Sequence, residues 1–247
     1  MTTFTQLFGV SQSTLKLNML NLDEVSNNLA NINTNGFKSK RLDFQEMLDN
    51  NQLSGSQLVS SQVDMTEGSM KTTEKELDMA INGNGFFSVR MPDGSIGYTR
   101  DGGFHRDGEG TIVNDAGNPL IWSGSLPQDG KSIRVSNNGT VSYISTTDGT
   151  NVEAGTISLT RFINPSGLES KGDNIWYETP ASGAAENGTP QADGYGLILD
   201  FTLEASNVDL AEQTTNTILI QRSFQVAISA MKQADTMMGQ AIRMRSA

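Results

Sequence analysis

Hydrophobic residues recur every seven positions at both ends of the chain. Near the N-terminus one such row begins at Phe8, while Ser11 and Asn18 interrupt the neighbouring row. Near the C-terminus a row that contains Phe224 runs beside a row of smaller residues that contains Ala227. This period is typical of helices that pack against other helices along a seam. The residues expected to pack between helices and between subunits are Phe8, Leu15, Leu22, Leu29, Ile220, Phe224, Ala227, Met231, Ala234 and Met238.

These rows predict one long helix at each end of the chain. The first is expected over residues 4–31, and it should end near Asn35-Gly36 because glycine readily takes the left-handed conformation that stops a helix. Neither helix has a partner within its own segment, so the simplest arrangement pairs residues 1–32 with residues 207–245 as an antiparallel coiled coil. An ordinary helix pair packed on the rest of the protein fits the periodicity equally well. Apolar surface that such a pair leaves uncovered would need neighbouring subunits.

Between the two helices the pattern changes to short apolar runs separated by turns. From Leu77 onward, Asn-Gly and Asp-Gly dipeptides such as Asp93-Gly94 fall between these runs. Such dipeptides are typical of consecutive β-hairpins. Residues 77–204 are therefore expected to form one antiparallel β-rich domain. Residues 46–76, rich in Ser and Gln, are expected to be an extended connector.

The fold class predicted is therefore α+β. Residues 1–45 and 205–247 would form the terminal helical coiled-coil domain, with the antiparallel all-β domain inserted between them. Composition supports this partition, because 22 of the 25 glycines and all six prolines lie in residues 46–207. Charge follows it too. Residues 1–45 and 208–247 each carry a net charge of +1, and the whole chain carries −11, so the net charge of the middle segment is −13.

Composition excludes several classes of function. The acidic balance argues against binding to nucleic acid or to an anionic membrane surface. The chain has no cysteine and one histidine, His105, which argues against disulfides, Cys-ligated metals, thiol nucleophiles and multi-His sites. It contains no apolar stretch long enough for a membrane span, and its first residues lack the pattern of a secretory signal.

No residues stand out as an active site. The acidic run that contains Asp101 and Asp107 fails the spacing of a calcium loop, and turns explain it better. Gly83-Asn84-Gly85 lacks the strand–loop–helix context of a phosphate loop. His105 has no nucleophile near it in the sequence. The sequence therefore predicts no catalytic, cofactor-binding or metal-binding residues, and no enzyme.

Several stretches resemble one family. NNLANINTNGFKSKRLDF, at residues 27–44, resembles the N-terminal signature of the flagellar basal-body rod and hook axial proteins. LDMAINGNGFF, at residues 77–87, and LEASNVDLAEQTTNTILIQRSFQ, at residues 203–225, resemble later blocks of the same family. The motif residues are Asn27, Asn28, Leu29, Ala30, Asn31, Asn35, Gly36, Phe37, Ser206, Asn207 and Val208.

The resemblance implies a structural axial subunit of the flagellar rod, which polymerises helically into a hollow drive shaft and export channel. Its terminal helices would form the innermost coiled coil. Its partners would be copies of itself, other rod and hook proteins and the flagellar type III export apparatus, with no nucleic acid, cofactor or membrane insertion. It would be located in the basal body after export across the inner membrane. Both the absence of cysteine and the absence of a signal peptide fit that route.

Alternatives stay open at this point. The likeness is shared between distal and proximal rod proteins, and a short hook-type protein also fits. A secreted β-rich adhesin would explain the acidic, turn-rich middle but not the helical rows at both ends. An enzyme on a β scaffold would need a pair of carboxylates in a groove.

Overall fold

The chain folds into two compact units. The computed structural model describes residues 2–49, 52–127, 130–146, 149–192 and 194–245. The helical unit comprises Met1–Asn31, Ser39–Asp64 and Val208–Ala247, and the β unit comprises Ile32–Lys38 and Met65–Asn207. Helices at the two ends of the chain flank a long series of antiparallel strands, so the predicted α+β class is confirmed.

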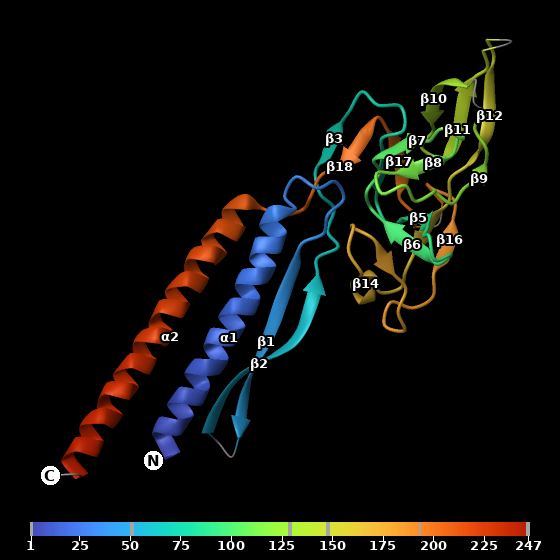
Figure 1. The fold of residues 1–247 in the computed structure, drawn as a ribbon. Coiled ribbons are helices and arrows are strands. Elements are labelled where there is room, and N and C mark those ends of the chain that lie inside the picture. Colours follow the sequence, from blue (N-terminus) through green and yellow to red (C-terminus); the bar gives the residue numbers. More distant parts are fainter. Residues whose placement is uncertain (1, 50–51, 128–129, 147–148, 193, 246–247) are drawn as a thin grey trace. The chain divides into compact units, whose positions relative to one another are not determined.

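The helical unit contains both long helices. α1 (Thr2–Ala30) and α2 (Leu210–Arg245) lie side by side, with the two chain ends at the same end of the pair, so they are antiparallel (Figure 1). Both helices lack proline, and each contains one glycine. The chain can therefore keep its helical hydrogen bonds over their whole length.

A β-hairpin completes the helical unit. β1 (Lys40–Asp49) pairs with β2 (Gln52–Val63) in antiparallel register, so that Lys40 lies opposite Val63. Both strands pack against α1. The expected connector, residues 46–76, is thus divided between a hairpin in the helical unit and a strand in the β unit. Pairing satisfies the backbone groups of this Ser- and Gln-rich segment, which needs no core of its own when it lies on a helix.

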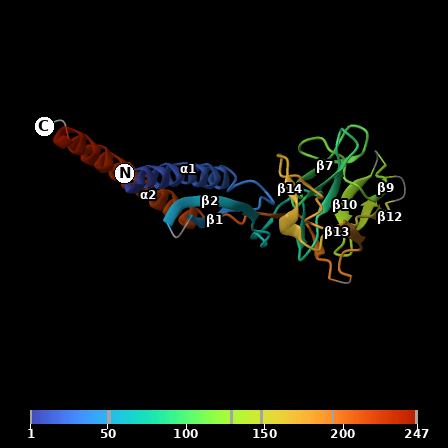
Figure 2. The same ribbon diagram turned by 90° about the horizontal axis from the view of Figure 1, so that it is seen from below.

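The β unit is built from short strands in several small antiparallel sheets (Figure 2). Its elements are β3 (Met70–Thr72), β4 (Met79–Asn82), β5 (Phe87–Arg90), β6 (Ile96–Thr99), β7 (Phe104–Arg106), β8 (Ile112–Asn114), β9 (Ser123–Gly124), β10 (Lys131–Val135), β11 (Thr140–Ile144), β12 (Asn151–Thr156), β13 (Leu159–Arg161), the 3₁₀ turn η1 (Pro165–Gly167), β14 (Glu169–Ser170), β15 (Trp176–Tyr177), β16 (Glu186–Gly188), β17 (Leu197–Asp200) and β18 (Thr202–Glu204). Two sheets have four strands, in the orders β10-β11-β12-β9 and β14-β15-β6-β5. The other pairs are β13-β16, β17-β4, β18-β3 and β7-β8.

The β unit has its own hydrophobic core. Side chains from most of its strands meet in one cluster, in which Ile81, Phe87 and Ile198 are fully buried. Phe87 and Phe104 add an edge-to-face contact, with ring centroids 5.3 Å apart. Every residue of this cluster lies between positions 77 and 198. The core therefore stabilises the β unit without help from the two helices.

Candidate functional site: the helical packing surface and the motif junction

Small and polar side chains form the seam between α1 and α2. On α1, Ser11 is buried and Asn18 is only 8% exposed; on α2, Ala227 is buried and Ala234 is 0% exposed. Asn18 Nδ2 donates a hydrogen bond to Ser223 Oγ at 3.0 Å. Alanine and serine let two helices approach closely, and a polar pair in the seam favours one register because any other would leave its amide unpaired.

The larger apolar residues of the predicted rows are less buried than the small residues of this seam. Of the ten predicted packing residues, Ala227 and Ala234 are buried in it. Leu15, Ile220, Phe224 and Met231 are half-buried, Leu22, Leu29 and Met238 are exposed, and the side chain of Phe8 lies outside the described residues. The row with Ser11 and Asn18, which the periodicity marks as an interruption, is the row that faces α2.

Further apolar side chains are exposed along α2. Val226 is 69% exposed, and these others are exposed as well: Leu210, Ile218, Leu219, Met237 and Met244. The spacing of the predicted rows does not include them, because they lie on other faces of the helix. Single exposed apolar residues are common, but a series along one helix marks a surface that another protein covers.

Asn28 of the N-terminal motif joins α1 to the hairpin. Its Nδ2 donates to the Lys40 carbonyl oxygen at 2.8 Å, and its Oδ1 accepts the Lys40 N–H at 3.0 Å. The side-chain amide thus bonds both the N–H and the carbonyl group of Lys40, as the backbone of a neighbouring strand would. This explains why asparagine, with a donor and an acceptor on one short side chain, suits the position.

The two sequence motifs meet inside the β unit. The Gly36 N–H donates to the Glu204 carbonyl oxygen at 2.7 Å, and the Asn207 N–H donates to the Phe37 carbonyl oxygen at 3.4 Å. Gly36 has φ +64°, and a Cβ atom there would lie 2.5 Å from the Arg100 carbonyl carbon. Only glycine fits this turn. We call residues 35–38 and 204–207 the motif junction.

The other motif residues show a range of exposure. Asn28, Gly36 and Val208 are buried, Asn31, Asn35, Phe37, Ser206 and Asn207 are half-buried, and Asn27, Leu29 and Ala30 are exposed. Asn35 offers its carbonyl oxygen to Asn174 Nδ2 at 2.8 Å, within the β unit.

A buried cluster of charges lies at the motif junction. Lys38 Nζ is 2.5 Å from Glu204 Oε1 and donates to the Thr66 carbonyl oxygen at 2.6 Å; the two side chains are 1% and 0% exposed. The Gly68 N–H also donates to Glu204 Oε1, at 3.0 Å. Arg100 Nη1 lies 3.6 Å from Glu204 Oε2. One carboxylate therefore faces two cations in the interior of the β unit.

Burial acts strongly on these cations. It lowers the pKa of Lys38 below its usual value, and the nearby Glu204 carboxylate opposes that shift. Burial also lowers the pKa of Arg100. Arg100 offsets part of its desolvation by donating to the carbonyl oxygens of Ile81 and Gly83, at 3.3 and 2.9 Å. Sequence reasoning missed this cluster, although Lys38 and Glu204 stand within the two quoted motifs.

Comparisons with known proteins match both terminal segments and the β unit of this chain. Three family models match: flagella basal body rod protein at residues 8–38, flagellar hook protein FlgE/F/G D1 domain at residues 80–143, and flagellar basal body rod FlgEFG protein C-terminal at residues 201–244. The flagellar basal-body rod protein FlgG of Buchnera aphidicola subsp. Acyrthosiphon pisum is 36% identical, over 93% of this chain and 95% of its own length. The FlgG protein of Caulobacter vibrioides is 33% identical, over 98% and 100%. The FlgF protein of the same organism is 34% identical, over 85% of each chain.

The chain belongs to the flagellar basal-body rod protein family. It is a structural subunit of the bacterial flagellar rod, and its place is the basal body. The resemblance stated from the motifs is confirmed. The N-terminal model, at residues 8–38, covers most of α1 and the first half of the motif junction. The C-terminal model, at residues 201–244, covers the second half of the junction and nearly all of α2.

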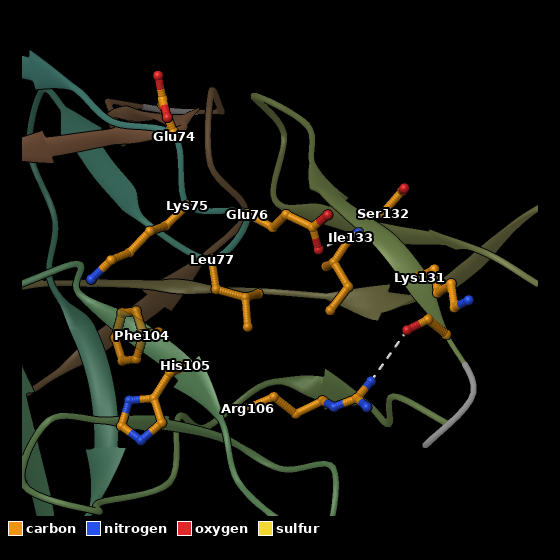
Figure 3. Close-up of a pocket in the computed structure, with 11 residues that line it drawn as sticks. Glu74, Lys75, Glu76, Leu77, Phe104, His105, Arg106, Lys131, Ser132 and Ile133 are labelled. Atoms are coloured by element: carbon orange, nitrogen blue, oxygen red, sulfur yellow. Dashed lines mark hydrogen bonds between the residues drawn. The ribbon is translucent and has the colours of Figure 1, made fainter.

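The β unit of this rod protein also carries a hollow of about 710 Å³ (Figure 3). It is lined by Glu74, Lys75, Glu76, Leu77, Phe104, His105, Arg106, Gly130, Lys131, Ser132 and Ile133. His105 is exposed there, with Nδ1 3.8 Å from Asp115 Oδ1. Across the described residues, no group of three or more His, Asp and Glu side chains could hold a metal ion. None of the helices described has a stretch long and apolar enough to span a bilayer.

Proposed function

We propose that this chain is a rod subunit of the FlgG type, and that the exposed apolar faces of α1 and α2 are the surfaces on which neighbouring subunits pack. One observation carries the second part. The seam within the subunit uses small and polar residues such as Ala234 and Asn18, while larger side chains such as Val226 are left exposed. A helix pair built only for its own stability would place the larger side chains in its seam.

The energetics favour assembly with further copies. Burying one Val, Leu or Met side chain contributes roughly 1.5–3 kcal/mol. Several such residues along α2 would together supply enough free energy to hold a helix of a neighbouring subunit. The packing residues of the predicted rows, among them Phe224 and Met231, would then be completed by neighbours.

Length and similarity support the FlgG type over the alternatives. FlgG relatives match this chain over nearly the whole of both sequences. A hook-type protein with a further β domain would be longer than this chain. An adhesin would not share both terminal motifs. The role is then structural, without catalysis.

The partners follow from the same role. We expect copies of this chain and other flagellar rod and hook proteins on its packing surfaces, and the flagellar type III export apparatus during secretion. A chain without cysteine can pass through an export channel unfolded without forming disulfides. The helices, which carry a net charge near zero, would line the channel of the rod.

Substitution of one exposed apolar residue tests the packing surface. Val226→Asp should prevent rod assembly, because a carboxylate would be buried against an apolar neighbour. Gln225→Asp, which adds the same charge at the adjacent exposed position of α2, is the matched control and should assemble. Rods are counted by electron microscopy of isolated basal bodies, and circular dichroism of the purified variants checks that the β unit is folded. Normal rods from Val226→Asp would rule out this surface.

A further inference from the structure

Five asparagines of the chain are followed directly by glycine. They are Asn35, Asn82, Asn84, Asn138 and Asn187. An asparagine in such a pair can lose its side-chain amide spontaneously, because the N–H of the next residue attacks the side-chain carbonyl carbon and glycine has no side chain to hinder the attack. Since all five have the same following residue, the folded structure decides which of them reacts.

In two of these pairs the glycine N–H is bonded to a backbone oxygen. The Gly36 N–H donates to the Glu204 carbonyl oxygen at 2.7 Å, and the Gly139 N–H donates to the Ser136 carbonyl oxygen at 2.8 Å. The asparagine of the second pair is held as well, since its side-chain oxygen accepts a backbone N–H at 3.1 Å. An N–H that is bonded in this way has to break its hydrogen bond before it can attack.

Two further pairs are held by side chains or by a strand ladder. The Gly83 N–H donates to Glu67 Oε1 at 2.6 Å. Gly188 is the last residue of β16, which is paired with β13. In the same strand, Asn187 Oδ1 accepts a hydrogen bond from Thr160 Oγ1 at 2.6 Å. Both pairs are therefore restrained in the folded chain.

Asn84 differs from the other four. It is exposed, and neither its side-chain amide nor the Gly85 N–H makes a hydrogen bond to any residue that the structure describes. It stands between Gly83 and Gly85, so no adjacent side chain covers it. Gly85 itself is buried, but the carbon that is attacked belongs to the exposed asparagine side chain, which is free to rotate and which water reaches.

We propose that Asn84 is a site of spontaneous covalent modification, and that it deamidates faster in the folded chain than the other four asparagines. The Gly85 nitrogen bonds to the Asn84 Cγ atom, the Cγ–Nδ2 bond breaks, and ammonia leaves with the proton of the Gly85 N–H. Solvent water then opens the resulting succinimide ring at either of its carbonyl carbons. One opening gives aspartate, and the other gives isoaspartate, in which the backbone runs through the side-chain carbon.

The modification would act where β4 is connected to β5. The Asn84 carbonyl oxygen accepts the Gly196 N–H at 2.7 Å, and Phe86 exchanges two backbone hydrogen bonds with Thr160, at 2.8 and 3.0 Å. Isoaspartate lengthens the backbone between these bonds by one carbon atom, so they cannot all keep their geometry. The new carboxylate also adds to the negative charge of the middle segment. We therefore expect modified chains to unfold at lower urea concentrations than unmodified chains.

Peptide mass spectrometry of the full chain tests the site. The purified protein is incubated in mildly alkaline buffer, with and without urea, and is digested with trypsin at successive times. One tryptic peptide, residues 76–90, contains both Asn82 and Asn84, and fragment ions that separate the two assign the change. In the folded chain Asn84 should react about tenfold faster than each of the others, a factor that one hydrogen bond can supply. In urea all five should react at similar rates, and an isoaspartate-specific methyltransferase should label the products.

Glu67→Ala is the matched variant, because it removes the acceptor of the Gly83 N–H from an exposed position. It should raise the rate at Asn82 and leave the rate at Asn84 unchanged. An unchanged rate at Asn82 would contradict the proposal, because the bond to the glycine would then not control the reaction. The proposal would also be overturned by equal rates at all five asparagines of the folded natural chain, or by an Asn84 that reacts in urea but stays intact in the folded chain. These two results need no variant, so the test stands even if Glu67→Ala fails to fold.

Discussion

Lys38 and Glu204 are 166 residues apart in the sequence, yet Nζ of the lysine lies 2.5 Å from Oε1 of the glutamate in the interior of the β unit. The pair joins Ile32–Lys38, the first segment of the chain in this unit, to the end of its second segment, Met65–Asn207. The backbone bond from Gly36 to Glu204 reinforces the same junction. The first segment of the β unit is thus held against the end of its second segment, and the two motifs lie where these segments meet.

Removing the carboxylate of this pair should destabilise the β unit strongly. Glu204→Gln removes the buried carboxylate that faces Lys38 and Arg100, and breaking a buried ion pair from one side destabilises by about 3–5 kcal/mol. Urea unfolding followed by tryptophan fluorescence measures the loss, since both tryptophans belong to the β unit. Glu169→Gln, at an exposed carboxylate, is the control and should change stability by less than about 0.5 kcal/mol. Equal stability of the two variants would show that the pair contributes nothing.

The stability of the β unit should depend on the ionisation of Asp101. Burial raises the pKa of this carboxyl to about 6, the nearby Asp115 and Asp78 add to the effect, and the bond from the Gly103 N–H opposes it. The unfolded chain loses its proton near pH 4, whereas the folded chain keeps it until about pH 6. Stability from this group is therefore present at low pH and is lost as the pH rises through that window, by about 3 kcal/mol in total.

Asp101→Asn tests this directly, because the amide keeps the acceptor for Gly103 and does not ionise. The variant should be more stable than the natural chain at pH 7 and nearly equal to it at pH 4. Urea unfolding at several pH values measures the difference between the two proteins. A difference that does not change with pH would contradict the buried, protonated carboxyl.

The small residues of the helical seam should resist enlargement. Ala234→Leu adds a side chain where α1 and α2 are in contact, and such overpacking destabilises by about 1–3 kcal/mol. We expect rod numbers in basal-body preparations to fall. Ala211→Leu, at an exposed position of α2, is the control and should assemble. If Ala234→Leu assembled as well as the control, α1 and α2 would not pack closely at this position.

The sequence predicted those parts of the fold that local patterns determine. The seven-residue rows identified both helices, and turn dipeptides such as Asp93-Gly94 identified hairpins such as β5–β6. Which row faces the partner helix was not predictable, because neighbouring rows share one period and only packing decides between them. The β1–β2 hairpin was not predicted either, since its Ser and Gln residues give no alternating pattern.

The candidate site was predictable only in part. Asn28 makes hydrogen bonds to the backbone of Lys40, and Gly36 forms a turn that only glycine fits. The sequence motifs contain both residues but do not indicate what they contact. The Lys38–Glu204 pair could not be derived from the sequence, because nothing local indicates that two residues so far apart will meet. The available signal was a charged residue directly after an apolar one in each motif, Lys38 after Phe37 and Glu204 after Leu203.

The central claim is that neighbouring subunits cover the apolar faces left exposed by a small and polar seam. An electron cryomicroscopy map of the assembled rod, at a resolution that shows side chains, measures this most directly. The account predicts that Leu219, Val226 and Met244 lie against helices of adjacent copies, while Asn18 and Ser223 stay paired within each copy. Side chains of Leu219 and Val226 that face water in the assembled rod would contradict it.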